Sequence, residues 1–156
     1  MTTVSTLAKH LALLLTTALA VLVMAGCAAE EAPSYQPSAG GEAGVPVAVA
    51  VPDLSEKAQS GEAVFNANCS ACHGANAAGT ALGPPLVHKI YEPGHHQDFS
   101  FRNAVQNGVV SHHWQFGNMA PVPGVAEDDV ERIICYVREL QRANGIFEDE
   151  RGLAAC

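Results

Sequence analysis

The clearest alternation of apolar and polar positions lies near the end of the chain, between Glu127 and Gly145. Apolar residues recur there every three or four positions, as one buried face of an α-helix requires. The stripe consists of Val130, Ile133, Ile134, Val137 and Leu140, with Tyr136 at its edge. Three acids at the start complement the positive end of a helix, and Gly145 provides a stop. The pattern predicts one amphipathic helix, with Arg138 and Arg142 near its C-terminal end.

A shorter helix is expected before the middle of the chain. Asp53 or Ser55 can cap it, and it runs to about Asn68. Its apolar positions are Ala58, Val64 and Phe65. Gly61 lies inside this helix at a cost of about 1 kcal/mol relative to alanine. We expect another helix to cross closely there, because close approach is what a glycine permits.

The sequence between these two helices predicts one more helix and long loops. Residues 100–107 fit a short helix that ends at Gly108. Residues 74–94 and 109–124 are rich in glycine or proline, and no stretch resembles a central strand. We therefore predict an all-α domain of three to four helices with long loops. Such a domain has a thin core, so a cofactor is expected to fill its centre.

The N-terminus carries an apolar block at residues 11–24, which follows Lys9 and ends in small residues before Cys27. Fourteen helical residues span about 21 Å, which is less than the roughly 30 Å of a bilayer core. The pattern is typical of a secretory signal peptide. The alternative is an uncleaved membrane anchor that also uses Leu7 and Ala8.

Residues 23–27 resemble a bacterial lipobox, with Met24 where leucine is commonest. Such a sequence is cut before the cysteine, whose thiol then carries a diacylglycerol. Each buried methylene contributes about 0.8 kcal/mol, and stable anchoring takes more than one acyl chain. We therefore predict a signal peptide over 1–26 and a lipid anchor at Cys27, on the periplasmic side of a bacterial membrane.

Composition divides the remaining chain into three parts. Residues 27–52 contain four prolines and three glycines, which is typical of a flexible linker. Within it, residues 45–51 alternate valine with small residues, and an extended tether is favoured over a short strand. The folded domain is predicted over 53–147, followed by a C-terminal tail at 148–156.

The charge of the chain is negative, with a formal value of −8 at pH 7. Removal of residues 1–26 would take away Lys9 and no acid, which leaves seven basic and sixteen acidic residues, or −9. This balance argues against nucleic acid or an anionic membrane surface as the binding partner. It favours a partner with a basic docking face, although solubility alone also accounts for an acidic surface.

The sequence Cys69-Ser70-Ala71-Cys72-His73 is the only Cys-x-x-Cys in the chain. Two thiols that add to porphyrin vinyl groups, followed by an iron-ligating histidine, make the attachment signature of c-type haem. A zinc site would need further ligands such as His95 and His96, but these are adjacent rather than spaced. A redox-active thiol pair usually follows a strand, whereas this motif follows a helix. Haem attachment is therefore favoured.

A haem that transfers electrons commonly has a second axial ligand, often methionine. Once the predicted signal peptide is removed, Met119 is the only methionine in the chain. It lies in a polar loop and not on an apolar helix face, which favours a ligand over a core residue. His112 and His113 are rivals for the same position, and His88, His95 and His96 are expected to face solvent.

On these residues the chain resembles the class I cytochromes c, from about Ser55 to Asn144. The resemblance covers Gly61-x-x-x-Phe65, the Cys69–His73 motif, Gly83-Pro84-Pro85-Leu86, the Met119 loop, and the last helix with Tyr136 and Leu140. It implies a fold wrapped around one covalent haem with His73 and Met119 as axial ligands. It also implies that Gly61 and Phe65 pack on Tyr136, and that the Pro84 carbonyl accepts a hydrogen bond from His73 Nδ1.

The function expected from these features is single-electron transfer by a membrane-tethered cytochrome c, without enzymatic activity of its own. Its redox partners would be respiratory or periplasmic, such as a terminal oxidase, a quinol-oxidising complex or a dehydrogenase. A dry shell is expected from Phe65, Leu86, Phe99, Phe101, Phe116, Ile133 and Val137. The Trp114 indole N–H can donate to a haem propionate, with ordinary packing as the alternative, and Tyr91 has the same two interpretations.

Two other functions remain open at this point. The domain could be the haem-bearing, electron-accepting subunit of a periplasmic dehydrogenase or oxidase complex, or a gas or redox sensor. Both would need an open or weak sixth iron position, for which His112 and His113 are relevant. Cys135 is expected to be a small buried residue on the last helix, and the alternative is a disulfide to Cys156 that staples the tail to the domain.

Overall fold

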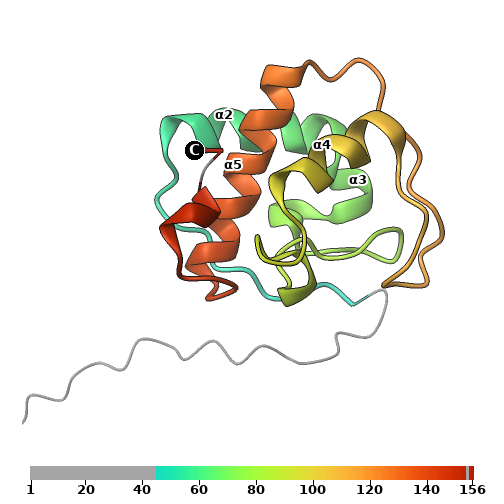
Figure 1. Cartoon of the computed structure of the whole chain (residues 1–156). Helices are drawn as coiled ribbons and strands as arrows, with labels where there is room; N and C mark the ends of the chain where they lie inside the picture. Colours follow the sequence, from blue (N-terminus) through green and yellow to red (C-terminus); the bar gives the residue numbers. More distant parts are fainter. Residues whose placement is uncertain (1–44, 154) are drawn as a thin grey trace, which may run out of the picture. The chain divides into compact units, whose positions relative to one another are not determined.

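The computed structural model describes residues 45–153 and 155–156, so the predicted signal peptide and Cys27 lie outside the described residues. Its α-helices are α2 (Glu56–Asn68), α3 (Ser70–His73), α4 (Asp98–Asn107) and α5 (Glu127–Ala143) (Figure 1). Short 3₁₀ turns occupy Ala75–Ala77, Lys89–Tyr91 and Glu150–Leu153. In this part of the chain the β-type pairing is limited to one antiparallel bridge, between Val109 and Met119. The prediction of an all-α fold is confirmed.

Among residues 45–153, no helix combines the length and the apolar character that crossing a bilayer requires.

The start of α2 is capped by Ser55, one of the two residues that the sequence suggests. The Ser55 hydroxyl accepts a hydrogen bond from the backbone N–H of Ala58 at 3.2 Å. The same hydroxyl donates to Glu139 of α5 at 2.6 Å, and the Ser55 N–H donates to the other carboxylate oxygen at 3.0 Å. The cap therefore also ties the beginning of α2 to the C-terminal half of α5.

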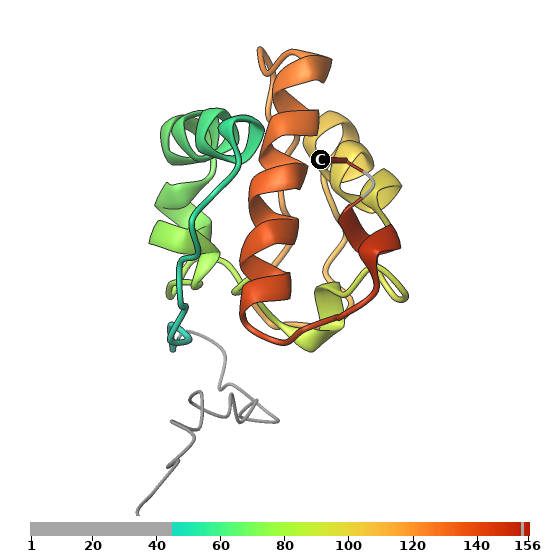
Figure 2. The same cartoon turned by 90° about the vertical axis from the view of Figure 1, so that its left-hand side faces the viewer.

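Helices α2 and α5 cross at Gly61, with α5 running through the middle of the domain (Figure 2). A Cβ atom at Gly61 would lie 1.9 Å from the backbone oxygen of Arg132, so the crossing depends on a missing side chain. One turn later the rings of Phe65 and Tyr136 pack with their centroids 5.5 Å apart. Both residues are fully buried, so Tyr136 belongs to the core and not to the edge of the stripe.

Substitution of Gly61 by alanine is expected to destabilise the domain by about 1–3 kcal/mol, the usual cost of overpacking a close contact. The added methyl group meets backbone, which cannot rotate away as a side chain can. Chemical denaturation of the haem-loaded protein measures the effect. Ser60→Ala, on the exposed side of the same helix, is the control, and an unchanged stability in Gly61→Ala would contradict the close crossing.

The core is formed mainly by α5. All five residues of the predicted apolar stripe are buried, together with Ala58 and Phe65 of α2 and Ala77, Val87 and Ile146 from the connecting segments. Helix α4 joins this core at its edge, through Phe101 and Val105, and Arg102 forms an ion pair with Glu131 of α5. Helix α5 therefore contributes most of the core, and α4 contacts it only at its edge.

The guanidinium of Arg138 is completely buried, which the helix pattern alone does not predict. It donates to the Asp98 carboxylate at 2.9 Å and to Gln141 Oε1 at 2.7 Å. It also donates to two backbone carbonyls, those of Tyr91 at 2.7 Å and His96 at 2.6 Å. Burial lowers the pKa of this guanidinium and Asp98 raises it, so the ion pair offsets part of the cost of burial. Arg138 thereby fastens the segment before α4 to α5.

Residues 45–52, the last part of the predicted linker, lie in extended conformation along the domain. The Val47 N–H donates to the Ala78 carbonyl at 2.8 Å. Asn144 exchanges two side-chain hydrogen bonds of 2.8 Å with the backbone of Ala50. Val49 also packs against the core. The tether therefore already contacts the folded domain at Val47, six residues before Asp53.

A disulfide joins Cys135 of α5 to Cys156 at the C-terminus, with Cα atoms 4.9 Å apart. The favoured expectation, an unpaired Cys135, is therefore wrong, although the residue is buried as expected. The bond holds the tail against α5, where Ala155 is buried and its carbonyl accepts a hydrogen bond from Lys57. Sequence could not decide the pairing, because it depends on how the tail turns back.

A double variant, Cys135→Ser with Cys156→Ser, is expected to lose about 2–4 kcal/mol of stability, as for other disulfides that close loops of about this size. Denaturation with and without a reductant measures this loss. The reductant should lower the stability of the wild type to that of the variant and leave the variant unchanged. Two free thiols in the denatured wild type, beyond those of the haem motif, would contradict the bond.

Candidate functional site

A cavity of about 330 Å³ opens between α2, α4, α5 and the loop that follows α4. Its apolar walls include Phe65, Leu86, Phe101, Ala104, Val105 and Ile133. The volume and the apolar walls are those of a small-molecule or cofactor site. The cavity borders the core, because Phe65, Phe101 and Ile133 belong to both.

The haem motif forms one wall of this cavity. Cys69 ends α2, and α3 follows at once, so that the His73 N–H donates to the Cys69 carbonyl at 2.9 Å. This helical turn brings Cys69 and His73 to the same cavity. Cys72 is exposed, and both thiols are free. Burial and the neighbouring Cys72 thiol raise the pKa of Cys69 to about 11, so its sulfur is held as a thiol.

The backbone after the motif folds tightly back onto it. Gly74 adopts a positive φ of 76°, and a Cβ atom there would lie 2.5 Å from the Gly79 carbonyl oxygen. The Gly79 N–H donates to the His73 carbonyl at 2.6 Å, and the Thr80 hydroxyl donates to that of Cys72 at 2.6 Å. These bonds place the following prolines beside the His73 ring.

The His73 ring is oriented by the Pro84 carbonyl oxygen, which lies 2.9 Å from Nδ1. A carbonyl only accepts, so Nδ1 carries the proton and the Nε2 lone pair is available to a metal. This is the contact that the family resemblance implies. Burial lowers the pKa of His73, and the Pro84 bond opposes this effect. The neutral ring is the form that ligates iron.

Met119 lines the same cavity as Cys69 and His73. Its backbone is fixed by the bridge to Val109, in which both N–H···O distances are 2.9 Å. Gly108 approaches closely as well, because a Cβ atom there would lie 2.4 Å from the Met119 carbonyl oxygen. The loop therefore presents this thioether from a defined backbone position, although no helix carries it.

Trp114 supplies a test of whether the cavity suits a haem. Its Nε1 is the one buried side-chain nitrogen or oxygen of the described residues that has no hydrogen-bond partner. Burial raises the pKa of Tyr91 to about 12, and the nearby Trp114 N–H opposes this rise. The Trp114 N–H and the Tyr91 hydroxyl are nevertheless not in hydrogen-bonding geometry. A buried donor without an acceptor is costly. A carboxylate such as a haem propionate would satisfy it.

The apolar residues expected to form the dry shell do not all do so. The cavity is lined by Phe65, Leu86, Phe101, Phe116 and Ile133, whereas Val137 is in the core. Phe99 also borders the cavity, but its side chain is 69% exposed, because it projects from the first turn of α4 away from the core. Phe99 is therefore at the cavity's rim and not in its wall.

Cys69 and the carbonyl-held His73 line an apolar cavity, and Cys72 lies beside them in the same motif, which is the arrangement expected of a protein that binds haem of the c type. The family model for cytochrome c matches residues 58–141, which is more than half of the chain. The protein therefore belongs to the cytochrome c family. Comparisons with curated proteins and with solved structures give no match.

Membership in this family establishes the cofactor and the general role. The cofactor is haem c, attached covalently, and the protein is a haem-based electron carrier of a family that typically transfers electrons and does not act as an enzyme. The matched range contains Cys69, Cys72, His73, Pro84 and Met119. The fit of the cavity, the orientation of His73 and the unpaired Trp114 donor agree with this cofactor.

A Trp114→Phe variant is expected to keep the packing of the ring but lose its N–H donor. If that donor stabilises a propionate, the propionate becomes a stronger negative influence on the iron, and the midpoint potential falls. Potentiometric titration of the two proteins measures the shift. Phe116→Leu, which also alters a cavity-lining ring, is the control, and equal potentials in wild type and Trp114→Phe would assign Trp114 to packing alone.

Proposed function

We propose that this protein is a lipid-anchored, monohaem cytochrome c that carries single electrons between periplasmic or respiratory redox partners. When bound, the haem supplies the reversible one-electron chemistry of its iron. The observation that carries the proposal is the meeting of Cys69, His73 and Met119 at one apolar cavity, with His73 already oriented by Pro84.

Each residue of the site has a distinct role in this proposal. Cys69 and Cys72 would hold the cofactor covalently through their sulfur atoms, and His73 and Met119 would bind its iron. A methionine thioether stabilises ferrous iron more than a second imidazole does, and it therefore raises the reduction potential. The apolar walls from Phe65, Leu86 and Ile133 exclude water, which acts in the same direction.

The lipid anchor at Cys27 is proposed from the sequence alone, since Cys27 lies outside the described residues. A tether converts a search through the periplasm into a search near the membrane, which raises the effective concentration at membrane-bound partners. Residues 45–52 of the linker contact the folded domain through Val47 and Ala50. The part of the linker that can act as a free tether is therefore shorter than residues 27–52.

The partners are proposed to be redox proteins with a basic docking face. The chain has eight more acidic than basic residues, so its field attracts positively charged surfaces and repels nucleic acid. Electron transfer to such a partner should slow as ionic strength rises, because salt screens the attraction between the two surfaces. The Debye length is about 8 Å at physiological ionic strength. A rate independent of salt would argue against electrostatic docking.

One set of measurements on purified membranes tests the proposal. The oxidised spectrum should show the long-wavelength charge-transfer band of methionine–iron ligation, and carbon monoxide should fail to bind the reduced form. Mass spectrometry should find Cys27 acylated. An open sixth position that binds carbon monoxide would favour the haem-bearing subunit of a dehydrogenase or oxidase complex, and an unmodified Cys27 would remove the anchor.

A further inference from the structure

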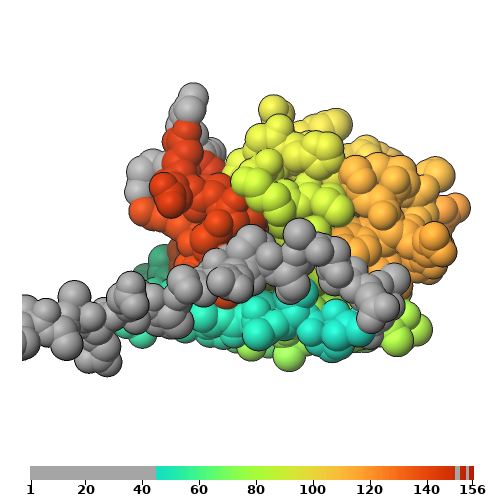
Figure 3. All heavy atoms as spheres, turned by 90° about the horizontal axis from the view of Figure 1, so that it is seen from below, coloured from blue at the N-terminus to red at the C-terminus, as the bar shows by residue number. Residues whose placement is uncertain are grey.

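Two pairs of adjacent histidines have no role as iron ligands in the haem site proposed above, although His96, His112 and His113 border its cavity. His95 and His96 lie between the 3₁₀ turn Lys89–Tyr91 and α4, and His112 and His113 lie in the loop that leads to Met119. The two segments, coloured yellow-green and orange, lie side by side on one face of the domain (Figure 3). The fold thus brings together histidines that are about eighteen residues apart in sequence.

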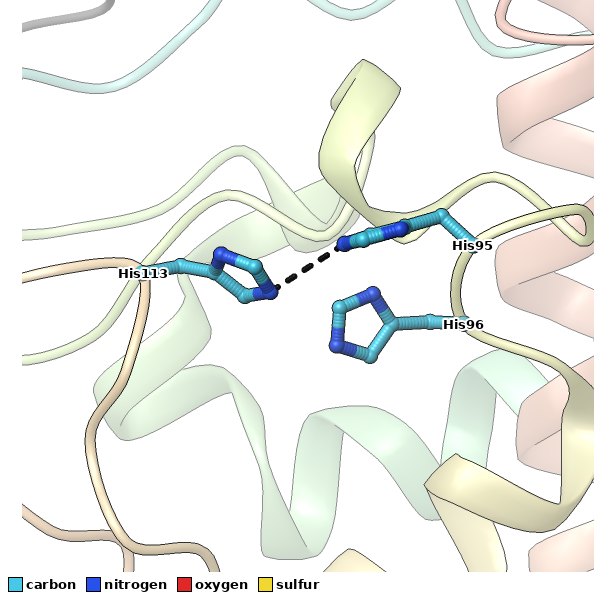
Figure 4. Close-up of side chains that lie close together, drawn as sticks. All are labelled: His95, His96 and His113. Carbon is cyan, nitrogen blue, oxygen red and sulfur yellow. Dashed lines mark hydrogen bonds between the residues drawn. The ribbon is translucent and has the colours of Figure 1, made fainter.

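The imidazole rings of His95, His96 and His113 converge (Figure 4). One ring nitrogen from each of the three lies within 4.8 Å of the others. The centroid of the His96 ring is 4.7 Å from that of the His95 ring and 5.1 Å from that of the His113 ring. His95 and His113 are exposed and His96 is half-buried, so burial of apolar surface does not explain why the rings gather.

The spacing of the closest pair is that of two ligands on one metal ion. His95 Nε2 and His113 Nε2 are 3.3 Å apart. A tetrahedral zinc ion with Zn–N bonds of about 2.0–2.1 Å holds its ligand nitrogens about 3.3–3.4 Å apart. Without a metal, one neutral ring must donate its proton to the other in this contact. A cation bound by both Nε2 lone pairs would take the place of that proton.

The orientation of His96 leaves its outer nitrogen free for a metal. Its Nδ1 lies 2.6 Å from the Ile90 carbonyl oxygen, which only accepts, so Nδ1 is protonated and Nε2 carries a lone pair. His112 has the same arrangement, with Nδ1 at 2.8 Å from the Val110 carbonyl oxygen. Metal-ligating histidines commonly donate their second N–H to such a carbonyl, which fixes the tautomer and the ring orientation.

The backbone under the cluster is held from inside the protein. The His96 carbonyl accepts a hydrogen bond of 2.6 Å from Arg138, whose side chain is fully buried in α5. The same guanidinium binds Asp98, two residues further along the chain. The His95–His96 segment is therefore preorganised by α5, whereas His113 belongs to the more exposed loop that carries Met119. Preorganised ligands cost less to bring together on binding.

We propose that His95, His96 and His113 form a binding site for a divalent first-row transition metal ion, with zinc as the reference ion and His112 beside the site. Imidazole nitrogens suit Zn²⁺, Cu²⁺ and Ni²⁺, and three of them leave a fourth position for water. His96 and His113 also line the haem cavity, so the ion would sit at its rim. It would connect the segment anchored on α5 to the loop that presents Met119.

Calorimetric titration of the haem-loaded, chelator-treated protein with ZnCl₂ tests the site. We expect one Zn²⁺ per chain, and at least about tenfold weaker binding in His95→Ala and in His113→Ala, since the loss of even an outer-shell partner commonly costs 10–100-fold. His88→Asn is the matched control. It changes a histidine outside the cluster and keeps an oxygen that can accept the Ile90 N–H.

A second readout follows from the bridging geometry. Zn²⁺ should slow amide hydrogen exchange over residues 111–118 in the wild type but not in His113→Ala, because only the former links the two segments. Wild-type affinity in the His95→Ala, His113→Ala double variant, or an absence of binding, would overturn the proposal. A changed haem spectrum in His113→Ala would assign that imidazole to the iron and would also overturn the proposed metal site. If Met119 proved not to bind the iron while Zn²⁺ binding stayed intact, only the haem assignment would change.

Discussion

The Met119→His variant is expected to have a midpoint potential lower than that of the wild type by on the order of 0.2 V, well within the roughly 0.8 V range that axial ligands set. The thioether favours ferrous iron, whereas an imidazole donates more strongly to ferric iron. The position tolerates the exchange because the backbone of Met119 is fixed by its bridge to Val109 and not by its side chain. Spectroelectrochemical titration measures the potential.

The matched control for this experiment is His112→Ala. His112 is a rival for the sixth position and lines the same cavity, but its ring is exposed. We expect its removal to leave both the potential and the methionine–iron band unchanged. An unchanged potential in Met119→His, or the loss of the band in His112→Ala, would transfer the ligand role away from Met119.

The parts of the fold that sequence predicts are those set by local patterns. The cap at Ser55, the stop at Gly108 and the buried stripe of α5 each depend on residues within a few positions of one another. The glycine at the helix crossing is visible in the sequence, but the reason for it lies in a distant segment. Gly61 indicates that another part of the chain approaches closely, and the structure identifies that part as the backbone of Arg132.

The parts that sequence does not predict depend on contacts between distant segments. The helix pattern places Arg138 near the C-terminal end of α5 and does not predict its burial, which depends on Asp98 and two carbonyls from another segment. Cys135 pairs with Cys156 only because the tail returns to α5. Two adjacent-histidine pairs were visible in the sequence, but only the packing of two loops makes a cluster of them.

The same distinction applies to the haem site. The spacing of Cys69, Cys72 and His73 is a local signature, and the resemblance then indicates Pro84, which lies 2.9 Å from His73. Whether Trp114 has a partner is a property of the three-dimensional surroundings, and so is the exposure of Phe99. Sequence therefore identifies the chemistry of this site better than it identifies the environment that tunes the chemistry.

An Arg138→Met variant is expected to be less stable than the wild type by about 3–5 kcal/mol, the usual cost of removing one partner from a buried ion pair. Methionine matches the apolar length of the side chain but removes the donor that Arg138 supplies to the Asp98 carboxylate and the His96 carbonyl. The Tyr91 carbonyl loses one of its two donors and keeps the hydrogen bond from Gln141. Arg138→Lys should recover only part of the loss, because one ammonium cannot reach acceptors that a planar guanidinium serves on three nitrogens.

The comparison that isolates this effect is Arg132→Met, the same substitution on the same helix. Arg132 pairs with Asp129 at the surface, where both side chains are about one-third exposed, so the loss should stay below about 1 kcal/mol. Guanidinium denaturation of the haem-loaded proteins measures both changes. Because Arg138 also holds the backbone of His96, its loss should weaken Zn²⁺ binding at the histidine cluster while Arg132→Met does not. Equal stabilities for the two variants would mean that the buried network contributes no more than a surface ion pair.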